Sequence, residues 1–439
     1  MYEQYLVESN PHWREEKLNT GTKRHLLYET IPLLDVDHII AITGIRRCGK
    51  SYFLRQIADY LLEQGVRPEQ ILFLNFEMPA FVGQKAYKVL DELFETYKKL
   101  KNPKGRLYLF FDEVQMLPEW ETWIKYNYDL LKGKIKFFIT GSNSHLLSSE
   151  FSTLLTGRII QKALYPFSFS EVLTHRNIKW RNIEDQIINK VQIIRSFEDY
   201  LVNGGMPEIL EIGNPELKRE FLISYFNAII YKDIIPRFSI REASLLNELA
   251  INLLSNTSNL ININRTAKYY NANRKTIREF IRFLQMAFFI FMVPKFHFSI
   301  KTRELSLKKC YAADNGFVHY LPLQFSPNSG KLLENLVFLE LKKRFEHVFY
   351  WRNSSECDFV AIDKSGQKNI FQVCYNLTPD NREREIKGLI SVVSKYPESK
   401  GIILTFNDKD EIEEAGKKIT VKPVYEWLIE NSNVNKFYE

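Results

Sequence analysis

The segment that most constrains this chain is residues 44–51, which read G-I-R-R-C-G-K-S. The apolar run 39–42 comes directly before it, and apolar residues with helical spacing follow it from Phe53 to Leu62. A strand, a glycine-rich loop and a helix in this order are typical of a phosphate-binding loop. The glycines let backbone N–H groups turn toward a β-phosphate, and the start of the helix adds positive charge. The alternative is a chance glycine-rich turn, which the flanking patterns disfavour.

The residues of this loop predict a nucleotide site with ATP and Mg²⁺ as cofactors. Lys50 is expected to reach the β- and γ-phosphates, and the Ser51 hydroxyl is expected to hold Mg²⁺. The residues predicted to line the site are Gly44, Ile45, Arg46, Cys48, Gly49, Lys50, Ser51 and Tyr52.

A second motif follows in residues 107–113. The continuous apolar run 107–111 is typical of a strand buried on both faces of a parallel sheet, and it ends in Asp112 and Glu113. In this Walker B pattern Asp112 orients the water shell of Mg²⁺, and Glu113 polarises the water that attacks the γ-phosphate. The alternative is that the two acids only cap a helix that starts after Pro118.

Two further positions are candidates for contact with the γ-phosphate. The predicted strand 135–140 runs into Gly141, and either Ser142 or Asn143 can hydrogen-bond the γ-phosphate or the attacking water from there, although the segment also fits an ordinary turn. Arg158 can point to the γ-phosphate of its own or a neighbouring subunit as an arginine finger. Alternatively, Arg158 satisfies carbonyl groups at a helix end.

Composition sets the broad class of the protein. The chain has 439 residues, of which 45% are hydrophobic, so several domains with real cores are expected. The N-terminus lacks a signal-peptide pattern, and the longest apolar run, 286–293, is too short to span a bilayer. We therefore predict a cytoplasmic protein without a membrane partner. The four cysteines lie far apart without C-x-x-C spacing, which indicates neither a zinc site nor a disulfide framework.

Strand and helix patterns alternate through the first part of the chain. This alternation predicts an α/β fold, in which a three-layer parallel sheet holds ATP at the C-terminal ends of its strands. Helical patterns follow from about residue 197 to 238 and are interpreted as a helical lid. The predicted organisation is a lead-in at 1–37, the ATPase core at 38–165, the lid at 166–240, a winged-helix module at 241–304 and a C-terminal α/β domain at 305–439.

The winged-helix prediction rests on residues 261–293. In this stretch a short helical pattern, the turn 271–273 and a second helical pattern precede a β-rich run. The apolar stripe of the second helix consists of Ile277, Phe280, Ile281 and Leu284, and its basic arc consists of Arg274, Lys275, Arg278 and Arg282. A basic helix in a DNA groove is one interpretation, which the net charge of +7 permits. The other is a brace between proteins or domains with a solvated basic face.

The C-terminal part has the layout of restriction-endonuclease-like folds. An apolar helix carrying Glu334 precedes three strand patterns, the second of which begins near Asp358. Such enzymes hold Mg²⁺ with carboxylates and assist the attacking water with a lysine. Here the last two positions are Gln372 and Cys374, and a neutral amide is a poor Mg²⁺ ligand while a thiol cannot replace an ammonium. We therefore predict a degenerate site without metal-dependent nuclease activity.

The ordered motifs of the chain resemble those of a known family. The segments G-I-R-R-C-G-K-S, L-F-F-D-E-V-Q, I-T-G-S-N-S and Y-L-V-N-G-G-M-P-E are similar to prokaryotic AAA-type ATPases with a C-terminal restriction-endonuclease-like domain of unknown function. The resemblance covers nearly the whole chain and implies ATP binding and the architecture given above. It adds Arg47 to the nucleotide site and supports Asn143 and Arg158 there. Many relatives have Glu and Lys where this chain has Gln372 and Cys374.

Three functional hypotheses follow. The first is an ATP-hydrolysing switch or motor whose winged-helix and C-terminal domains bind nucleic acid or a partner without cutting. The second is an ATP-regulated nuclease that recruits a replacement cation, such as Arg384 or Lys387. The third is a nucleotide sensor or scaffold that binds ATP and barely hydrolyses it. The partners named by these hypotheses are ATP, DNA or another nucleic acid, a protein, and further copies of the chain in a homo-oligomer.

Overall fold

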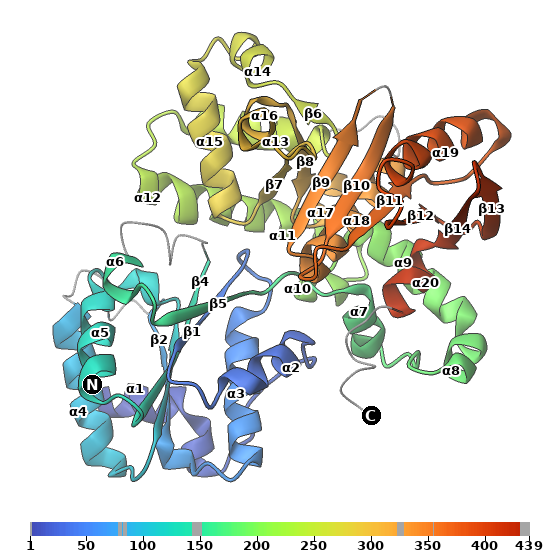
Figure 1. The fold of residues 1–439 in the computed structure, drawn as a ribbon. Helices are drawn as coiled ribbons and strands as arrows, with labels where there is room; N and C mark the ends of the chain where they lie inside the picture. The colour runs from blue at the N-terminus through green and yellow to red at the C-terminus, as the bar shows by residue number, and fades with distance from the viewer. Residues whose placement is uncertain are drawn as a thin grey trace. The chain divides into compact units, whose positions relative to one another are not determined.

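The computed structural model describes residues 2–77, 81, 86–142, 152–322, 329–353 and 355–430. The chain forms two compact units (Figure 1). The first unit consists of Met1–Tyr165 with Met286–Phe288, and the second consists of Pro166–Gln285 with Phe289–Glu439.

A five-stranded parallel sheet forms the centre of the first unit, with the strand order β2-β3-β4-β1-β5. Every residue of β1 and β4 is buried, as expected for central strands covered on both faces. This sheet confirms the predicted parallel α/β core. Its strands are β1 (Ile39–Thr43), β2 (Ile71–Asn75), β3 (Leu107–Asp112), β4 (Ile135–Gly141) and β5 (Ile159–Ala163).

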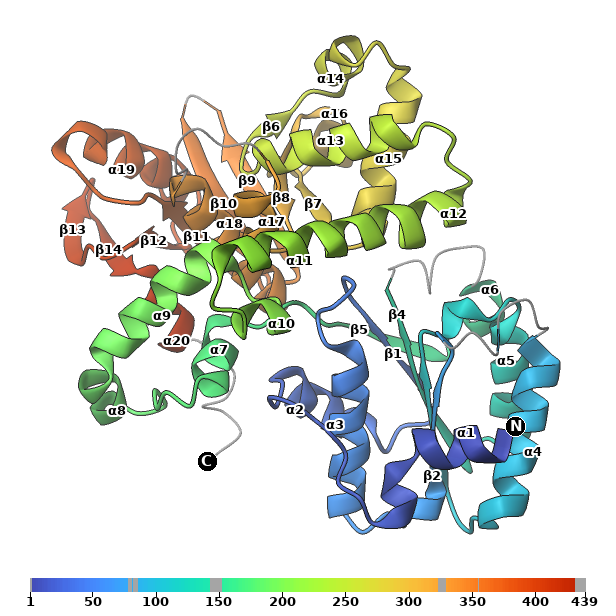
Figure 2. The same ribbon diagram turned by 180° about the vertical axis from the view of Figure 1, so that it is seen from behind.

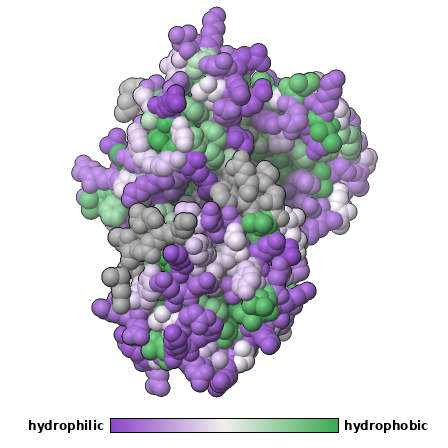
Figure 3. All heavy atoms as spheres, turned by 90° about the vertical axis from the view of Figure 1, so that its left-hand side faces the viewer, coloured by the Kyte–Doolittle hydropathy of each residue, from purple (hydrophilic) through white to green (hydrophobic). Residues whose placement is uncertain are grey.

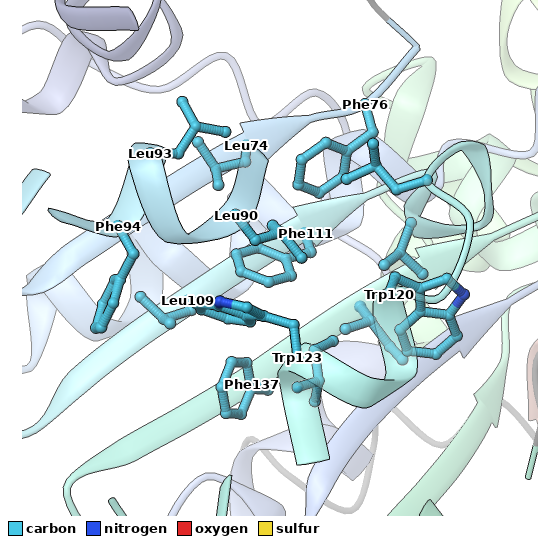
Figure 4. Packing of buried hydrophobic residues seen from close by; sticks show 14 of the residues in the cluster. Leu74, Phe76, Leu90, Leu93, Phe94, Leu109, Phe111, Trp120, Trp123 and Phe137 are labelled. Carbon is cyan, nitrogen blue, oxygen red and sulfur yellow. The ribbon is translucent and has the colours of Figure 1, made fainter. Parts of the chain in front are cut away.

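Helices cover both faces of this sheet. Helix α3 (Lys50–Glu63) packs on one face, and helices α4 (Ala86–Lys101) and α5 (Trp120–Leu130) pack on the other. Neighbouring residues of a strand point to opposite faces, and Phe111 accordingly joins the cluster beneath α4 and α5, where its ring centroid lies 5.9 Å from that of Trp123 (Figure 4). The three layers hold the C-terminal ends of the strands in fixed positions, which is where a site can be built.

The first unit contains further short helical elements. They are α1 (Tyr2–Ser9), η1 (Pro11–Arg14), α2 (Leu26–Thr30), η2 (Ile31–Leu33), η3 (Pro68–Gln70), η5 (Val114–Met116) and α6 (Ser152–Leu155).

The N-terminal segment lies along the outer edge of β2. The Tyr5 hydroxyl accepts a hydrogen bond from the Asn75 N–H at 2.8 Å and donates to the Asn75 carbonyl at 2.9 Å. Two residues along the strand, the Asn10 side chain accepts from the Phe73 N–H at 2.7 Å and donates to the Phe73 carbonyl at 3.0 Å. Side chains thus replace a neighbouring strand at this edge of the sheet.

The same pattern continues at Ile71, the first residue of β2. The indole of Trp13 donates to the Ile71 carbonyl at 2.9 Å, and the His12 ring lies 3.2 Å from that carbonyl. Part of the predicted polar lead-in therefore belongs to the first unit as a cover for its edge strand. This role depends on partners some 60 residues later in the chain, which local sequence patterns do not reveal.

The second unit begins with helices. Figure 2 shows α11, the π-helical element η7 and α12 as one nearly continuous rod. The Gly204–Gly205 turn between α9 and α10 is tightly packed, because a Cβ atom at Gly204 would lie 1.8 Å from Asp314 Oδ1. The helices are α7 (Phe169–His175), α8 (Ile183–Ile188), α9 (Lys190–Asn203), α10 (Pro207–Leu210), α11 (Pro215–Ala228), η7 (Ile229–Ile234), α12 (Ile235–Phe238) and α13 (Ala243–Ser255).

A three-stranded antiparallel sheet follows, in the order β6-β8-β7. Its last strand, β8, lies beyond the predicted domain boundary after residue 304, so that boundary separates two strands that pair with each other. The elements of this part are β6 (Leu260–Ile261), α14 (Ile263–Tyr269), α15 (Arg274–Met286), β7 (Ile290–Val293), α16 (Ile300–Leu305) and β8 (Lys308–Ala312).

The C-terminal part contains a six-stranded mixed sheet in the order β13-β14-β12-β11-β10-β9. Helices α18 and α20 contact one face, through Phe359 and Phe371, and α19 packs on the apolar cluster of the other face. The elements are α17 (Asn315–Tyr320), α18 (Ser329–Arg344), β9 (His347–Arg352), β10 (Glu356–Ile362), β11 (Lys368–Val373), α19 (Pro379–Val393), β12 (Lys400–Thr405), β13 (Asp410–Glu414), β14 (Lys417–Pro423) and α20 (Val424–Glu430).

Among the described residues on the face drawn in Figure 3, hydrophilic residues predominate and hydrophobic ones occur in small groups. Within the described ranges, none of the helices has the length and apolar character needed to cross a membrane.

Candidate nucleotide site

Two glycines shape the loop between β1 and α3. A Cβ atom at Gly44 would lie 2.1 Å from the Leu164 carbonyl oxygen, so only glycine fits there. Gly49 has a φ of 97°, in the left-handed region that favours glycine, and α3 begins at the next residue, Lys50. The loop therefore turns sharply from the strand into the helix, as a phosphate-binding loop requires.

A buried arginine from the N-terminal segment supports this loop. The guanidinium of Arg24 donates to the Cys48 carbonyl at 2.9 Å and to the Tyr165 carbonyl at 2.6 Å. The Cys48 thiol donates to the Leu164 carbonyl at 3.3 Å, and burial raises the pKa of this thiol. Arg24 was not predicted from the sequence, since nothing near it in the chain indicates its distant partners.

Lys50 lies at the centre of the site and is only 4% exposed. Its Nζ donates to the carbonyls of Gly44 at 3.2 Å and Ile45 at 3.3 Å. The same Nζ lies 3.6 Å from Oε1 of Glu113. The fold thus brings together the loop lysine and the Walker B glutamate, two residues that the sequence assigned to one site.

Thr140, at the end of β4, connects the two Walker B acids. Its hydroxyl donates to Asp112 Oδ1 at 2.5 Å and accepts a hydrogen bond from the Glu113 N–H at 2.9 Å. Burial and the neighbouring Glu113 raise the pKa of Asp112, whereas Ser51, Thr140 and Lys50 act in the opposite direction. The sequence analysis placed the polar contact of this strand one or two residues later and so missed Thr140.

The residues at Asp112 fit a divalent cation. Asp112 is 1% exposed, and its Oδ2 has no hydrogen-bond partner among the residues that the structure describes. The hydroxyl of Ser51 is close enough to favour the ionised form of Asp112. A hydroxyl and an unpaired carboxylate oxygen are oxygen ligands of the type that Mg²⁺ prefers.

Glu113 has an unusual backbone and a direct side-chain partner. Its φ of 51° places it in the left-handed region, which is uncommon for a residue with a side chain and is often found at functional sites. Its Oε2 accepts a hydrogen bond from the side-chain amide of Gln115. Gln115 therefore helps to fix the orientation of the Glu113 carboxylate, a role that the sequence analysis did not assign.

The remaining predicted residues of the loop lie around this centre. Arg46 forms an ion pair with Glu77 at 2.9 Å, just beyond the end of β2. Arg47 has a φ of 69°. Tyr52 is 43% exposed, and the guanidinium of Arg55 lies 5.3 Å from the centroid of its ring.

The sequence analysis named two positions for contact with the γ-phosphate, the segment after β4 and Arg158. Asn143 lies outside the described residues, and Ser142 is buried directly after β4. Arg158 pairs with Asp129 at 3.1 Å, and its carbonyl accepts from the Ile39 N–H at 2.8 Å. Arg158 therefore lies where β1 and β5 begin, whereas the phosphate-binding loop follows the end of β1. The proposed contact with the γ-phosphate of its own subunit is wrong for this reason, and a contact in a neighbouring subunit stays a prediction.

The basic residues predicted for nucleic-acid binding lie together on α15. Arg274, Lys275, Arg278 and Arg282 are exposed, and the apolar stripe of the same helix is buried. Arg282 lies over the ring of Phe283, with 5.2 Å from its guanidinium carbon to the ring centroid. The helix thus has one buried and one basic side, as its sequence pattern predicts.

The predicted degenerate site in the C-terminal part contains a residue that the sequence analysis missed. Glu334 and Asp358 both contact Lys309 of β8, at 3.2 Å and 3.0 Å. Burial and Asp358 raise the pKa of Glu334 to about 7. Burial disfavours the charged amine of Lys309, but Tyr311 and the carboxylates outweigh it and hold the Lys309 pKa well above its usual range.

The other positions of that predicted site are also engaged. The Gln372 amide donates to Glu385 Oε2 at 2.6 Å and accepts from the Asp358 N–H at 3.3 Å. Burial raises the pKa of the Cys374 thiol to about 12. Arg384 forms an ion pair with Glu385, and Lys387 is exposed.

Comparisons with known proteins agree with the geometry of the first unit. The family described as AAA domain matches residues 36–173, and two families described as domains of unknown function (DUF8612 and DUF4143) match residues 194–329 and 329–427. The uncharacterized protein MJ1544 of Methanocaldococcus jannaschii is 33% identical over 407 residues, which are 89% of this chain and 88% of the relative. An uncharacterized protein of Haemophilus influenzae is 29% identical over 420 residues, 93% of this chain and 98% of the relative.

Among solved structures, the Orc1 protein of Aeropyrum pernix in complex with DNA is similar, with 13% identity and a TM-score of 0.30 over 73% of this chain and 96% of that chain. This TM-score is too low for the similarity to support an argument about fold or function. The sequence identity to MJ1544 over most of both chains is decisive. The chain belongs to the same family as MJ1544, and its first unit carries an ATP-binding AAA domain with a P-loop.

Proposed function

We propose that this protein is an ATP-hydrolysing AAA-type switch or motor, whose α15 region and C-terminal domain bind nucleic acid or a protein partner without cutting it. One observation carries the catalytic part. The Thr140 hydroxyl links Asp112 and Glu113, and Glu113 lies 3.6 Å from Lys50. The three side chains to which we assign metal binding, water activation and phosphate binding, Asp112, Glu113 and Lys50, therefore lie together in one buried place.

Each of these side chains has a distinct task in the proposed reaction. Ser51 and Asp112 would hold Mg²⁺, which neutralises charge on the β- and γ-phosphates when it is bound. Lys50 leaves the loop carbonyls and binds the phosphate oxygens. Glu113 orients the attacking water and takes up its proton, and Thr140 keeps the backbone of Glu113 fixed while it does so.

Arg158 is assigned to a neighbouring copy of the chain. Its position at the start of β5 is at the opposite end of the sheet from its own loop. An arginine there can complete a site only across an interface between copies, where it would stabilise charge on the γ-phosphate. The proposal therefore includes a homo-oligomer.

The nucleic-acid part of the proposal rests on α15. Its side chains Arg274, Lys275 and Arg278 are exposed and have no ion-pair partner among the residues that the structure describes. Unpaired cations along one side of a helix favour phosphate contacts, since binding releases the counterions of the nucleic acid. A protein brace would be expected to neutralise such charges with acidic neighbours.

The test is the rate of ATP hydrolysis with no addition, single-stranded DNA, duplex DNA or RNA, with Lys50→Ala as the inactive control. We expect measurable hydrolysis by the parent and stimulation by at least one nucleic acid. Hydrolysis without stimulation would point to a protein partner. Tight ATP binding with near-zero turnover under every condition would refute the switch or motor and favour a nucleotide sensor or scaffold.

A further inference from the structure

Lys309 is surrounded by carboxylates in the second unit. Its side chain is 3% exposed, and its Nζ lies 3.0 Å from Asp358 Oδ1, 3.0 Å from Glu356 Oε1 and 3.2 Å from Glu334 Oε1. The Tyr311 hydroxyl adds a hydrogen bond to Glu334 Oε1 at 2.7 Å. One ammonium thus occupies the point at which three acidic side chains from α18 and β10 converge.

This point is where the nuclease-like layout would hold a divalent metal. The sequence analysis named Glu334 and Asp358 as the carboxylates of that site, and the fold does bring them to a common cation. That cation is the Lys309 ammonium. The second oxygen of Asp358 is engaged as well, because it accepts a hydrogen bond from the Val373 N–H at 3.0 Å. Within the described ranges, no group of three His, Cys, Asp or Glu side chains is arranged to hold a metal ion.

The flanking positions offer no replacement ligand. Glu385, the acid nearest to Gln372, accepts hydrogen bonds from the Gln372 amide at 2.6 Å and from Arg384 Nε at 3.1 Å. The Cys374 side chain is a buried thiol. Mg²⁺ therefore does not fit this set of residues, since Glu334 Oε1, Glu356 Oε1 and both oxygens of Asp358 already have a cation or an N–H partner.

We propose that the Lys309 ammonium is a built-in replacement for the divalent metal of this domain. It pairs with Glu334, Glu356 and Asp358 at the point where a metal would bind, but it provides no open coordination position for a water nucleophile. It also ties β8 of the three-stranded sheet to α18 and β10 of the C-terminal domain. This inference goes beyond the proposed ATPase function and does not depend on it.

The experiment compares Mn²⁺ binding and thermal unfolding in the full chain without nucleotide, first in a chelator and then in millimolar Mn²⁺. The variants are Lys309→Ala, Lys309→Ala with Asp358→Asn, and Asp358→Asn. The matched control is Lys308→Ala, which removes the neighbouring lysine that pairs with Glu304 at the surface.

We expect no Mn²⁺ binding at Asp358 in the parent or in Lys308→Ala, so the parent and Asp358→Asn should bind the same amount of Mn²⁺. Lys309→Ala should lower the melting temperature in chelator by at least ~6 °C, because it leaves buried carboxylates unpaired. Mn²⁺ should restore much of this loss in Lys309→Ala and none of it in the double variant. Parent, Lys309→Ala and Asp358→Asn should all leave plasmid DNA uncut in Mg²⁺ or Mn²⁺.

Two results would overturn the proposal. The first is Mn²⁺ binding or DNA cleavage by the parent that disappears in Asp358→Asn. The second is a folded Lys309→Ala variant whose melting temperature is indifferent to Mn²⁺. If Lys309→Ala does not fold, Lys309→Met with Glu334→Gln removes the ammonium together with one carboxylate and is measured in the same way. Because Ser51 and Asp112 can also take up Mn²⁺, only the part of the parent's Mn²⁺ response that disappears in Asp358→Asn counts against the proposal.

Discussion

The ammonium of Lys50 lies 3.6 Å from the carboxylate of Glu113, and both side chains are buried. The lysine comes from the loop after β1, and the glutamate follows β3, two strands away in the sheet. The phosphates of ATP would compete with Glu113 for the Lys50 ammonium. ATP binding is therefore expected to break the Lys50–Glu113 ion pair and free the Glu113 carboxylate.

The first prediction concerns these two residues. Lys50→Ala should abolish ATP binding or hydrolysis, because no other described residue places an ammonium in the site. Glu113→Gln should bind ATP but hydrolyse it at least ~10²-fold more slowly, since an amide cannot take up the proton of the attacking water. Binding of a fluorescent ATP analogue and steady-state phosphate release separate the two effects. Full turnover by Glu113→Gln would remove Glu113 from the mechanism.

The second prediction concerns Arg24, which supports the phosphate-binding loop through the carbonyls of Cys48 and Tyr165. Arg24→Met should destabilise the first unit by about 2 kcal/mol or more, since it leaves two buried acceptors without a charged donor. ATP affinity should fall with it, because the loop is held less firmly. Urea unfolding with and without ATP measures both effects. Arg14→Met, at an exposed arginine paired with Glu16, is the matched control and should change neither.

The third prediction concerns Arg158 and a neighbouring subunit. Lys50→Ala and Arg158→Ala should each be inactive alone, but a mixture of the two should regain ATPase activity. In a mixed oligomer an intact loop of one subunit can meet the intact Arg158 of the next. If the mixture stays inactive, Arg158 does not act across the interface, and its role is the ion pair with Asp129 in its own subunit.

The fourth prediction concerns the exposed basic side of α15. Arg274→Ala with Arg278→Ala should weaken nucleic-acid binding and reduce the slope of log affinity against log salt by about one unit for each lost phosphate contact. Lys301→Ala, on α16, is a control for a general loss of positive charge. Unchanged affinity and slope in the double variant would make this module a protein brace.

The fifth prediction is a pH effect from His12, which lies beneath the edge of β2. Burial lowers the pKa of His12 to about 4, whereas the unfolded chain should protonate near 6.5. The unfolded state therefore binds more protons between these values, and stability is lost as the pH falls through this window. Between pH 7.5 and pH 4.5 the loss due to His12 should be roughly 2 to 3 kcal/mol.

The matched variant for this effect is His12→Gln, whose amide can still donate to the Ile71 carbonyl but does not titrate. Urea unfolding of parent and variant at the two pH values gives the difference directly. Equal pH dependence in both proteins would show that His12 does not contribute to acid destabilisation.

The nucleotide site was predictable because its parts have local signatures. Lys50 and Ser51 are defined by the spacing of the loop, and Asp112 and Glu113 by the strand that ends at them. Their meeting in space follows from a general rule, since parallel strands end at the same edge of the sheet. The place of Arg158 was harder to predict, because only the pairing of β5 with β1 shows that this residue lies at the opposite end of the strands from the phosphate-binding loop.

Other functional contacts had no local signature. Thr140 precedes the Gly-Ser-Asn segment to which the sequence analysis assigned a γ-phosphate contact, and only the pairing of β3 with β4 brings the Thr140 hydroxyl to Asp112. Lys309 belongs to a strand whose sequence, K-K-C-Y-A, gives no reason to prefer one lysine over the other. Which of the two turns inward depends on the pairing of β8 with β7 and on the distant Glu334 and Asp358.

The hydrogen bonds from Tyr5 and Asn10 to β2 also have a consequence for the association of copies. An uncovered edge strand can pair with the edge of another molecule and begin a growing intermolecular sheet. The N-terminal segment prevents this with the side chains of Tyr5 and Asn10, which form hydrogen bonds to the strand but present no strand of their own. Shortening the chain to begin at residue 15 would expose a ready template, so aggregation should precede any loss of ATP binding.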